Sequence, residues 1–512
     1  MEERVKKKRA KTVFTLILLV LANVIVFGYI WLVDKYDKVQ LDQILYQLKS
    51  STKGTNPGFV LQSFLLIFSE VVIATLIEIG IYLILSGKAK KLLERSAFYI
   101  KYSASKVCAF FKKRALSLTA IQLIFAMIIF IVGLDVGAFV ITSTTESDFI
   151  EENYVDPESV DIKFPEQKRN LIYIFLESME TTFSDTEAGG SITEDFIPEL
   201  SELAAENVSF SNTDGMGGAY SYFGTTWTAA ALFAQTSGMI IKVPLFADDY
   251  DTEFLPGITT LGDILEKEGY NQTLLFGSDA EFACRDTYFT NHGGYKIVDT
   301  VSLKADGRLP ENYNEWWGFE DEKLFEYAKE ELSELAALGE PFNFTMLTAD
   351  THFPEGYKCP LCEDRFELPY ANVLSCSSKQ VYNFINWVKE QPFYENTTII
   401  LAGDHLTMDP EFLEEIDEDY ERTVYNCIIN GVPTPEKMTG RSFGTFDLFP
   451  TTLAAMGVKI EGERLGLGTN LYSGEKTLGE IYGFEFMNEE LQKKSEFYNT
   501  RFYMKKDKYS LV

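Results

Sequence analysis

Three long apolar runs in the first 141 residues constrain the fold more than any other feature of the chain. They cover residues 13–33, 59–85 and 115–141. Each is long enough, as a helix, to cross a hydrocarbon core of about 30 Å. The first run follows a basic leader and has no small-x-small cleavage site, so it reads as a retained anchor rather than a signal peptide. The sequence therefore predicts a membrane domain with three transmembrane helices over residues 1–141.

The basic residues predict how this domain is oriented. The leader is rich in Lys and Arg, and the segment 87–114 carries nine of them against the single acid Glu94. Loops on the cytoplasmic side of a membrane carry such an excess. We therefore expect a multi-pass cell-membrane protein with a cytoplasmic N-terminus and with everything after residue 141 outside the cytoplasm.

The rest of the chain is strongly acidic. Residues 1–141 hold 19 Lys/Arg and 9 Asp/Glu, whereas residues 142–512 hold 27 and 67. A domain this acidic is a poor partner for nucleic acid, whose phosphates need basic side chains. The charge suits a solvated domain that binds metal cations. We therefore expect no nucleic-acid partner.

Two acids and a group of cysteines leave alternatives open. Glu70 and Glu78 interrupt the second apolar run about 80° apart around a helix, so they can share a protein-facing side, in a structural or a functional role. The "CPLC" motif, with Cys359 and Cys362, resembles half of a zinc knuckle, but no second CxxC follows. A disulfide from either cysteine to Cys376 is the favoured interpretation.

Beyond the membrane domain, the pattern predicts an α/β fold. Residues 142–168 are polar and acidic and are predicted as a linker. Short, continuous apolar runs of the kind buried on both faces of a parallel sheet then recur at 170–178, 271–279, 341–352, 397–405 and 424–432. Helical patterns lie between them at 198–207, 228–238, 258–270, 321–339, 374–391 and 445–457. This alternation predicts a three-layer α/β/α domain over 169–480, followed by a C-terminal extension over 481–512.

Acidic and imidazole side chains stand where the predicted strands end. In open parallel sheets, ligands bind beyond the carboxyl ends of the strands. The residues found there are Glu177, Asp279, Asp350 with His352, and Asp404 with His405. Such mixed oxygen and nitrogen ligands suit Mn²⁺, Mg²⁺ or Zn²⁺.

Thr228 begins a helical segment rich in alanine. A threonine there is often only an N-cap, whose oxygen accepts a free backbone N–H. The alternative is a nucleophile, because a metal ion and the positive end of a helix both favour the alkoxide. A helix start also attracts phosphate.

Several motifs together resemble one family. The sequence is similar to the sulfatase-like phosphoglycerol transferases of the alkaline-phosphatase superfamily, which include the enzymes that modify periplasmic glucans and the lipoteichoic acid synthases. The resemblance covers about residues 150–475. It is carried by "NLIYIFLESMETTF", "GTTWTAAALFAQTSG", "FGSDAEFACRDTYFTNHGGY", "TADTHFPEGY", "SCSSKQVYNFI", "AGDHLTM" and "FDLFPTTLAAMGVKIEGERLGLGTNL", in that order.

The resemblance implies a set of site residues. One divalent ion, most often Mn²⁺ with Mg²⁺ or Zn²⁺ as alternatives, would be held by Glu177, Thr228, Asp404 and His405. Thr228 would be the nucleophile, with Thr225 and Thr226 as alternatives. The substrate-binding residues would be Asp279, Arg285, His352 and, on the loop that follows Arg285, His292. Asp279 and Arg285 belong to the glycerol- and phosphate-binding loop, where lipoteichoic acid synthases have a histidine and this chain has Gly277.

The resemblance also implies an activity. Phosphatidylglycerol in the outer leaflet would donate glycerophosphate through a phospho-threonine-type intermediate to a hydroxyl of a glycan or teichoic-acid-type acceptor. The alternatives are a phosphoethanolamine transferase of the same superfamily and a non-catalytic membrane-anchored binding protein. A formylglycine sulfatase is disfavoured because "TTWTAAAL" lacks the Cys or Ser of the C/S-x-P-x-R motif.

Overall fold

The computed structural model describes residues 2–36, 40–55, 57–89, 106–243, 253–414, 416–417 and 419–503. The chain divides into two compact units. The first comprises Met1–Leu41 and Asn56–Val140, and the second comprises Asp42–Thr55 and Ile141–Val512.

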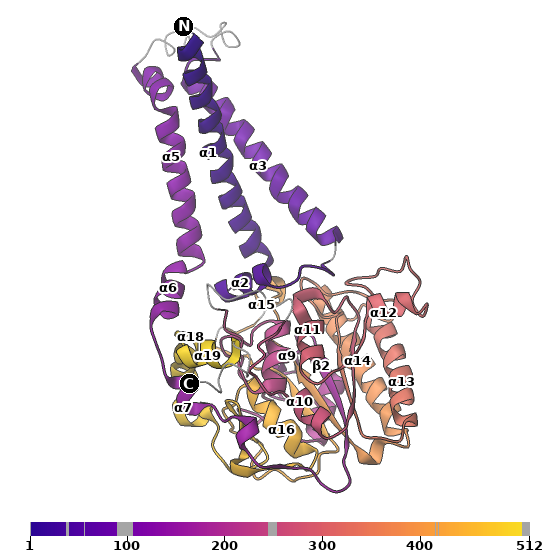
Figure 1. Ribbon diagram of the computed structural model, residues 1–512. Coiled ribbons are helices and arrows are strands. Elements are labelled where there is room, and N and C mark those ends of the chain that lie inside the picture. Colours follow the sequence, from indigo (N-terminus) through magenta and orange to yellow (C-terminus); the bar gives the residue numbers. More distant parts are fainter. Residues whose placement is uncertain are drawn as a thin grey trace. The chain divides into compact units, whose positions relative to one another are not determined.

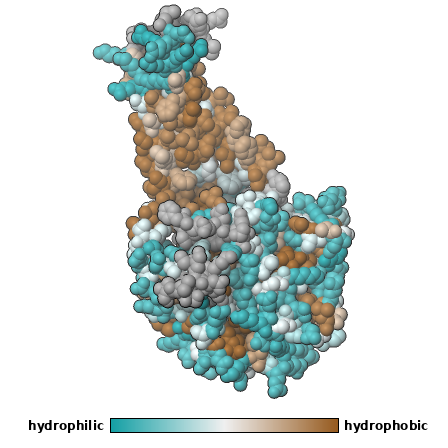
Figure 2. Space-filling view, in the orientation of Figure 1, coloured by the Kyte–Doolittle hydropathy of each residue, from teal (hydrophilic) through white to brown (hydrophobic). Residues whose placement is uncertain are grey.

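The first unit is built from three long helices, α1 (Glu2–Lys35), α3 (Pro57–Leu85) and α5 (Lys106–Gly133). By length and composition all three could cross a membrane. Figure 2 shows apolar side chains over their outer surface and a hydrophilic cap at the N-terminal end of α1. Three membrane-type helices were predicted, and the structure has them.

The third helix ends earlier than the apolar run suggests. The run extends to residue 141, but α5 stops at Gly133, and Asp135 adopts a left-handed φ of 47°. A second helix, α6 (Val136–Thr144), starts directly afterwards. Hydrophobicity alone does not register such a break, because both helices are apolar. Most of the basic segment 87–114 lies outside the described residues, so the predicted orientation stays a prediction.

A polar cluster joins the three long helices. The Glu78 carboxylate accepts hydrogen bonds from Nδ2 of Asn23 on α1, at 2.9 Å, and from Nε2 of Gln122 on α5, at 2.6 Å. Asn23 also donates to Oγ1 of Thr75, at 3.0 Å. Glu78 therefore faces neighbouring helices. This is the protein-facing position expected for an ionisable group in a membrane span.

The second unit contains a six-stranded sheet in the order β4-β3-β5-β2-β6-β7. All neighbouring strands are parallel except β6 and β7. The predicted strands are all present, and β4 is the one the sequence pattern missed. The bounds are β2 (Asn170–Leu176), β3 (Asn271–Phe276), β4 (Lys296–Val298), β5 (Phe342–Leu347), β6 (Thr397–Gly403) and β7 (Asn426–Ile429).

Helices cover both faces of this sheet (Figure 1). Alternate residues of β2 point to opposite sides, so Tyr173 joins one hydrophobic core and Ile174 the other. Helices on the Tyr173 side are α9 (Thr228–Ser237), α10 (Leu261–Lys267), α11 (Arg285–Asn291) and α16 (Leu448–Ala455). Helices on the Ile174 side are α8 (Pro198–Glu206), α12 (Thr300–Ala305), α13 (Asp321–Ala337) and α14 (Pro369–Lys389). This is the predicted three-layer α/β/α arrangement.

Segments that were predicted to lie outside the α/β domain also belong to this second unit. Asp42–Thr55, which includes most of α2 (Leu41–Lys49), clusters here rather than with the long helices, and the Tyr46 hydroxyl donates to the Ala283 carbonyl at 2.6 Å. The predicted linker buries Phe149 of α7 (Phe149–Asn153) in the core. The predicted extension, 481–512, contributes α18 (Phe484–Gln492) and α19 (Glu496–Tyr503), with buried Tyr498, and α17 (Leu478–Tyr482) crosses its predicted boundary. Smaller elements are β1 (Ile162–Lys163), β8 (Lys459–Ile460), β9 (Arg464–Leu465), β10 (Gly468–Thr469) and α15 (Pro410–Leu413).

The cysteines of the CPLC motif are free thiols. Sγ of Cys359 lies 3.6 Å from Sγ of Cys362 and 3.7 Å from Sγ of Cys376. A disulfide needs about 2.05 Å. The predicted partners therefore come together as expected, but the favoured disulfide interpretation is wrong for this structure, because three sulfurs share one cluster without a bond.

Candidate active site

The carboxyl ends of β2 and β6 carry the first three candidate ligands. The two strands pair in parallel with Leu176 opposite Gly403, so Glu177 and Asp404 leave the sheet side by side. Only glycine fits at position 403, because a Cβ there would come within 1.9 Å of the Met179 carbonyl oxygen. Glu177, Asp404 and His405 are all buried, and their ligand atoms lie within 4.8 Å of one another.

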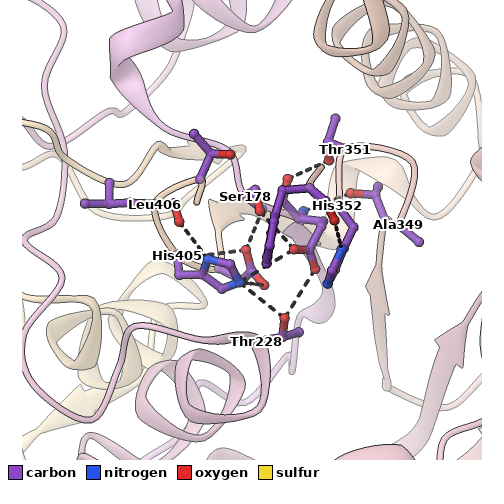
Figure 3. A network of polar contacts seen from close by, with 12 residues as sticks. Ser178, Thr228, Ala349, Thr351, His352, His405 and Leu406 are labelled. Atoms are coloured by element: carbon purple, nitrogen blue, oxygen red, sulfur yellow. Dashed lines mark hydrogen bonds and ion pairs between the residues drawn. The ribbon is translucent and has the colours of Figure 1, made fainter. Parts of the chain in front are cut away.

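Thr228, the first residue of α9, completes this group. Its Oγ1 lies 3.3 Å from Nε2 of His405 and 3.4 Å from Oε2 of Glu177 (Figure 3). Nε2 of His405 is in turn 3.4 Å from Oδ2 of Asp404. Oxygen and nitrogen ligands at about 2.1 Å from one ion in tetrahedral geometry are about 3.4 Å apart. We call Glu177, Thr228, Asp404 and His405 the carboxylate–imidazole cluster, and their spacing fits a single divalent ion.

Backbone and hydroxyl groups orient the carboxylates. Oδ1 of Asp404 accepts N–H groups from Ser178, at 2.7 Å, and from His405, at 2.8 Å. Oδ2 is buried and has no hydrogen-bond partner among the described residues. Ser178 holds a left-handed φ of 53°, and its hydroxyl donates to Oε1 of Glu177 at 2.9 Å. Strain of this kind concentrates at functional sites. An unpartnered carboxylate oxygen aimed into the cluster suits a cation.

The electrostatics of the cluster also favour a cation. Burial, together with the charge of Glu177, raises the pKa of Asp404 to about 7. Burial alone would lower the pKa of His405, but the neighbouring carboxylates of Asp404 and Glu177 raise it. Nδ1 of His405 contacts the Leu406 carbonyl at 2.9 Å and so carries the proton, which leaves the Nε2 lone pair facing Thr228. A divalent ion would stabilise both carboxylates in their charged form.

His352 lies beside the cluster on the loop after β5 (Figure 3). Its Nδ1 donates to the Phe353 carbonyl at 2.7 Å, and its ring packs edge-on against Trp317 at 5.1 Å between centroids. Burial is the main cause that lowers the pKa of His352 to about 4. The imidazole is therefore neutral near pH 7, with Nε2 as a hydrogen-bond acceptor.

The predicted phosphate-binding loop follows β3. Arg285, at the start of α11, is buried and donates to Oγ of Ser278 at 2.9 Å and to the Asp279 carbonyl at 2.8 Å. Burial lowers the pKa of Arg285 to about 10, while the charge of Glu177 opposes that change. Gly277 has no room for a side chain, because a Cβ would lie 2.6 Å from the Phe319 carbonyl oxygen.

Two other candidates make their contacts elsewhere. The ring nitrogens of His292 contact Oδ2 of Asp263 at 3.1 Å and the Phe254 carbonyl at 2.7 Å. The structure therefore gives His292 a place in the packing between α10 and α11 rather than a contact with the cluster. Thr225 is fully buried, and its hydroxyl donates to the Tyr222 carbonyl at 2.8 Å. Of Thr225 and Thr228, Thr228 is the one whose hydroxyl contacts Glu177 and His405.

Sequence reasoning missed two residues that support the cluster. Ser178 binds both carboxylates, as described above. Gln235 lies about two turns along α9 from Thr228, on the same helix face. It donates from Nε2 to the Gly403 carbonyl at 2.8 Å and accepts the Tyr173 hydroxyl at 2.9 Å, which ties α9 to β6 and β2. Ser178 stands directly after Glu177, so its position was a signal, whereas its left-handed backbone was not readable from the sequence.

A mainly parallel sheet between two helix layers, with a ligand cluster and a helix-initial threonine at its carboxyl edge, defines an alkaline-phosphatase-like domain. The family model for Sulfatase matches residues 169–458. The chain belongs to the sulfatase family, as the sequence motifs indicated.

Known proteins are similar over the same region. Phosphoglycerol transferase I of Escherichia coli O127:H6 and of Shigella flexneri are each 30% identical over 327 residues, which is 62% of this chain and 41% of theirs. A solved structure of a protein in the alkaline phosphatase superfamily from Vibrio parahaemolyticus is 20% identical and has a TM-score of 0.49, with 65% of this chain and 79% of that chain covered. The chain thus spans less than half the length of these curated relatives.

Proposed function

We propose that this protein is a metal-dependent phosphoglycerol transferase that moves glycerophosphate from phosphatidylglycerol to a hydroxyl of a glycan or polyglycerophosphate. The observation that carries the proposal is the position of Thr228. Its hydroxyl stands at the N-terminus of α9, within 3.4 Å of Glu177 and 3.3 Å of His405. A hydroxyl is a weak nucleophile unless a base, a metal or a helix dipole favours its alkoxide.

The donor set fits a divalent ion held by Glu177, Thr228, Asp404 and His405, for which we propose Mn²⁺, with Mg²⁺ and Zn²⁺ as alternatives. Two carboxylates, one imidazole and one hydroxyl suit a hard or borderline ion. When bound, such an ion supplies positive charge that lowers the pKa of the nucleophile and stabilises phosphoryl oxygens.

In the first half-reaction, Oγ1 of Thr228 attacks the phosphorus of the lipid. The bond from phosphorus to the diacylglycerol oxygen breaks, and that oxygen takes up the proton given up by Oγ1 of Thr228, so that diacylglycerol leaves as the alcohol. Glycerophosphate is then esterified to Thr228. The N-terminus of α9 stabilises the anionic phosphoryl group, because free backbone N–H groups there point outward along the helix axis.

In the second half-reaction, an acceptor hydroxyl attacks the same phosphorus. Nε2 of His352 takes the proton of that hydroxyl, Oγ1 of Thr228 is released, and the proton passes from His352 to Oγ1, which restores both side chains. His352 suits this role because its ring is neutral near pH 7, which leaves the Nε2 lone pair to accept a proton, and its Nδ1–H is already committed to the Phe353 carbonyl. Arg285 and Asp279 would contact the phosphate and the glycerol of the bound group.

The three long helices fit a lipid donor. We propose that they hold the protein in the cell membrane, with a cytoplasmic N-terminus and an extracytoplasmic catalytic domain. The basic leader and segment 87–114 support this orientation. Protease added to intact cells should cut the α/β domain and spare the leader, and cleavage of the leader alone would reverse the proposed orientation.

The test is a transfer assay with the full-length protein in detergent. Phosphatidylglycerol labelled in its headgroup glycerol should yield diacylglycerol and protein-bound label in the presence of Mn²⁺. Label should then pass to an added glycan or glycerophosphate polymer. Peptide mapping should place the trapped label on Thr228, and label on Thr225 or Thr226 instead would contradict the assignment.

Two comparisons separate the alternatives. Consumption of phosphatidylethanolamine in place of phosphatidylglycerol would identify a phosphoethanolamine transferase. Failure of wild-type protein, loaded with metal, to consume either lipid would favour a non-catalytic binding protein. Thr228→Ser is the matched control for Thr228→Ala, because it retains a hydroxyl at the same helix position.

A further inference from the structure

A second cluster of metal-type ligands follows His352 in the sequence. Cys359 and Cys362 belong to the loop between β5 and α14, and Cys376 lies within α14. Their sulfur atoms all lie within 4.8 Å of one another. Cys359 and Cys376 are buried, and Cys362 is half-buried. We call these three residues the thiol cluster.

The spacing within the thiol cluster distinguishes a metal site from a disulfide. The separations of 3.6 and 3.7 Å from Cys359 to the other two sulfurs are far longer than a covalent S–S bond. Two sulfurs bound at about 2.3 Å to one tetrahedral zinc ion lie about 3.8 Å apart. Two separations therefore match a zinc–thiolate site at once, whereas a disulfide would join one pair and leave the third sulfur over.

We propose that Cys359, Cys362 and Cys376 bind one Zn²⁺ as thiolates, at a site separate from the carboxylate–imidazole cluster. Zinc takes four ligands, so three thiolates leave one position for water. The half-buried side of Cys362 is where water has access. Sulfur ligands also select zinc over Mn²⁺ or Mg²⁺, which favour oxygen.

The surroundings suit negatively charged sulfur. The side-chain amide of Gln380, 8% exposed, donates from Nε2 to Sγ of Cys376 at 3.5 Å and reaches Sγ of Cys359 at 3.9 Å. A buried donor that contacts ligand atoms is the usual second layer of a metal site. Zinc ligands must be deprotonated to bind.

The consequence of such an ion would be structural. The same loop carries His352, and within it the Tyr357 N–H donates to the Asp350 carbonyl at 2.7 Å. Further along, the N–H of Arg365 donates to Oδ1 of Asn372 on α14 at 2.7 Å. Zinc between Cys359 and Cys376 would add a further tie between loop and helix. The thiol cluster would therefore position the loop that carries His352 without contacting substrate.

Co²⁺ substitution tests the proposal. The full-length protein, purified under reducing conditions and stripped with chelator, should bind Co²⁺ with a thiolate-to-cobalt charge-transfer absorption that Zn²⁺ then abolishes. The carboxylate–imidazole cluster has no sulfur, so Asp404→Asn should retain this absorption. The result is thus independent of the proposed transferase activity.

Variants and a control make the assignment specific. Cys362→Ser and Cys376→Ser should each weaken or abolish the thiolate-to-cobalt absorption, called the sulfur band below. Cys427→Ser is the matched control, because Cys427 is buried in the same domain, donates to the Leu203 carbonyl at 3.4 Å and keeps a donor as serine. It should leave the band unchanged. If Cys376→Ser fails to fold, the wild-type spectrum and the variant of half-buried Cys362 still decide whether the thiol cluster binds the metal ion.

Two results would overturn the proposal. One is the absence of a sulfur band from wild-type protein whose thiols are all free to react with an alkylating reagent after unfolding. The other is a disulfide between two of the three cysteines, found as a mass lower by two hydrogens in protein purified without reductant, that persists when Zn²⁺ is supplied during folding.

Discussion

The carboxylate–imidazole cluster and the thiol cluster each bring three metal-type side chains within 4.8 Å, but the fold builds them differently. Glu177 and Asp404 are far apart in sequence and meet because β2 and β6 are neighbours in a parallel sheet. The three cysteines lie within 18 positions, on one loop and one helix. The sheet fixes the first cluster before any ion binds, whereas the second depends on a loop. We therefore expect metal at the first cluster to serve chemistry and metal at the second to serve loop order.

The largest predicted effect comes from Thr228→Ala, and it should separate the catalytic role of the carboxylate–imidazole cluster from the structural role of the thiol cluster. Thr228→Ala removes the proposed nucleophile and should lower the transfer rate by at least ~1,000-fold. Because Thr228 does not contact sulfur, the same variant should retain the Co²⁺–thiolate absorption. Thr228→Ser should keep measurable activity. Transfer at the wild-type rate by Thr228→Ala would contradict the assignment of the nucleophile.

The next largest effect should come from the loss of a ligand carboxylate. Asp404→Asn keeps an oxygen for the N–H groups of Ser178 and His405 but puts a neutral amide in place of unpartnered Oδ2. We expect Mn²⁺ affinity to fall beyond the ~10–100-fold that removal of a supporting residue costs. Calorimetric titration of chelator-treated protein measures this. Unchanged Mn²⁺ affinity would place the ion elsewhere.

The sequence predicted the first cluster better than the second for a physical reason. Continuous apolar runs mark buried parallel strands, and the residues that follow them must gather at one sheet edge, so Glu177, Asp404 and His405 were identifiable. The thiol cluster depends on loop geometry, and sequence spacing alone favoured a disulfide. Long-range packing was also unreadable, as the contact of Tyr46 with Ala283 shows, because α2 is polar, short and far from its partner in the chain.

Asp350 stands two residues before His352 and should govern a pH effect. Burial, with the charge of Asp321, raises the pKa of Asp350 to about 10. The folded state therefore holds a proton that the unfolded state releases near pH 4, so stability falls as pH rises from there towards 10. Asp350→Asn removes this dependence. Between pH 6 and 8 the wild-type protein should lose up to about 3 kcal/mol of unfolding free energy through this proton. Asp350→Asn should not show this loss, which denaturant titration measures at each pH. An unchanged slope would mean that Asp350 is ionised in the folded protein.

The smallest effect should come from Ser178, which orients a ligand without binding the ion. Ser178→Ala deletes the hydroxyl that donates to Oε1 of Glu177 at 2.9 Å but keeps the N–H that donates to Asp404. Mn²⁺ affinity should fall about tenfold, the lower end of what a supporting hydrogen bond contributes. Ser184→Ala is the matched control, because Ser184 is buried nearby in sequence and its hydroxyl donates to the Thr181 carbonyl rather than to a residue of the cluster. Equal losses of Mn²⁺ affinity in both variants would indicate general destabilisation, whereas a loss confined to Ser178→Ala shows that the sheet edge orients its ligands through this one hydroxyl.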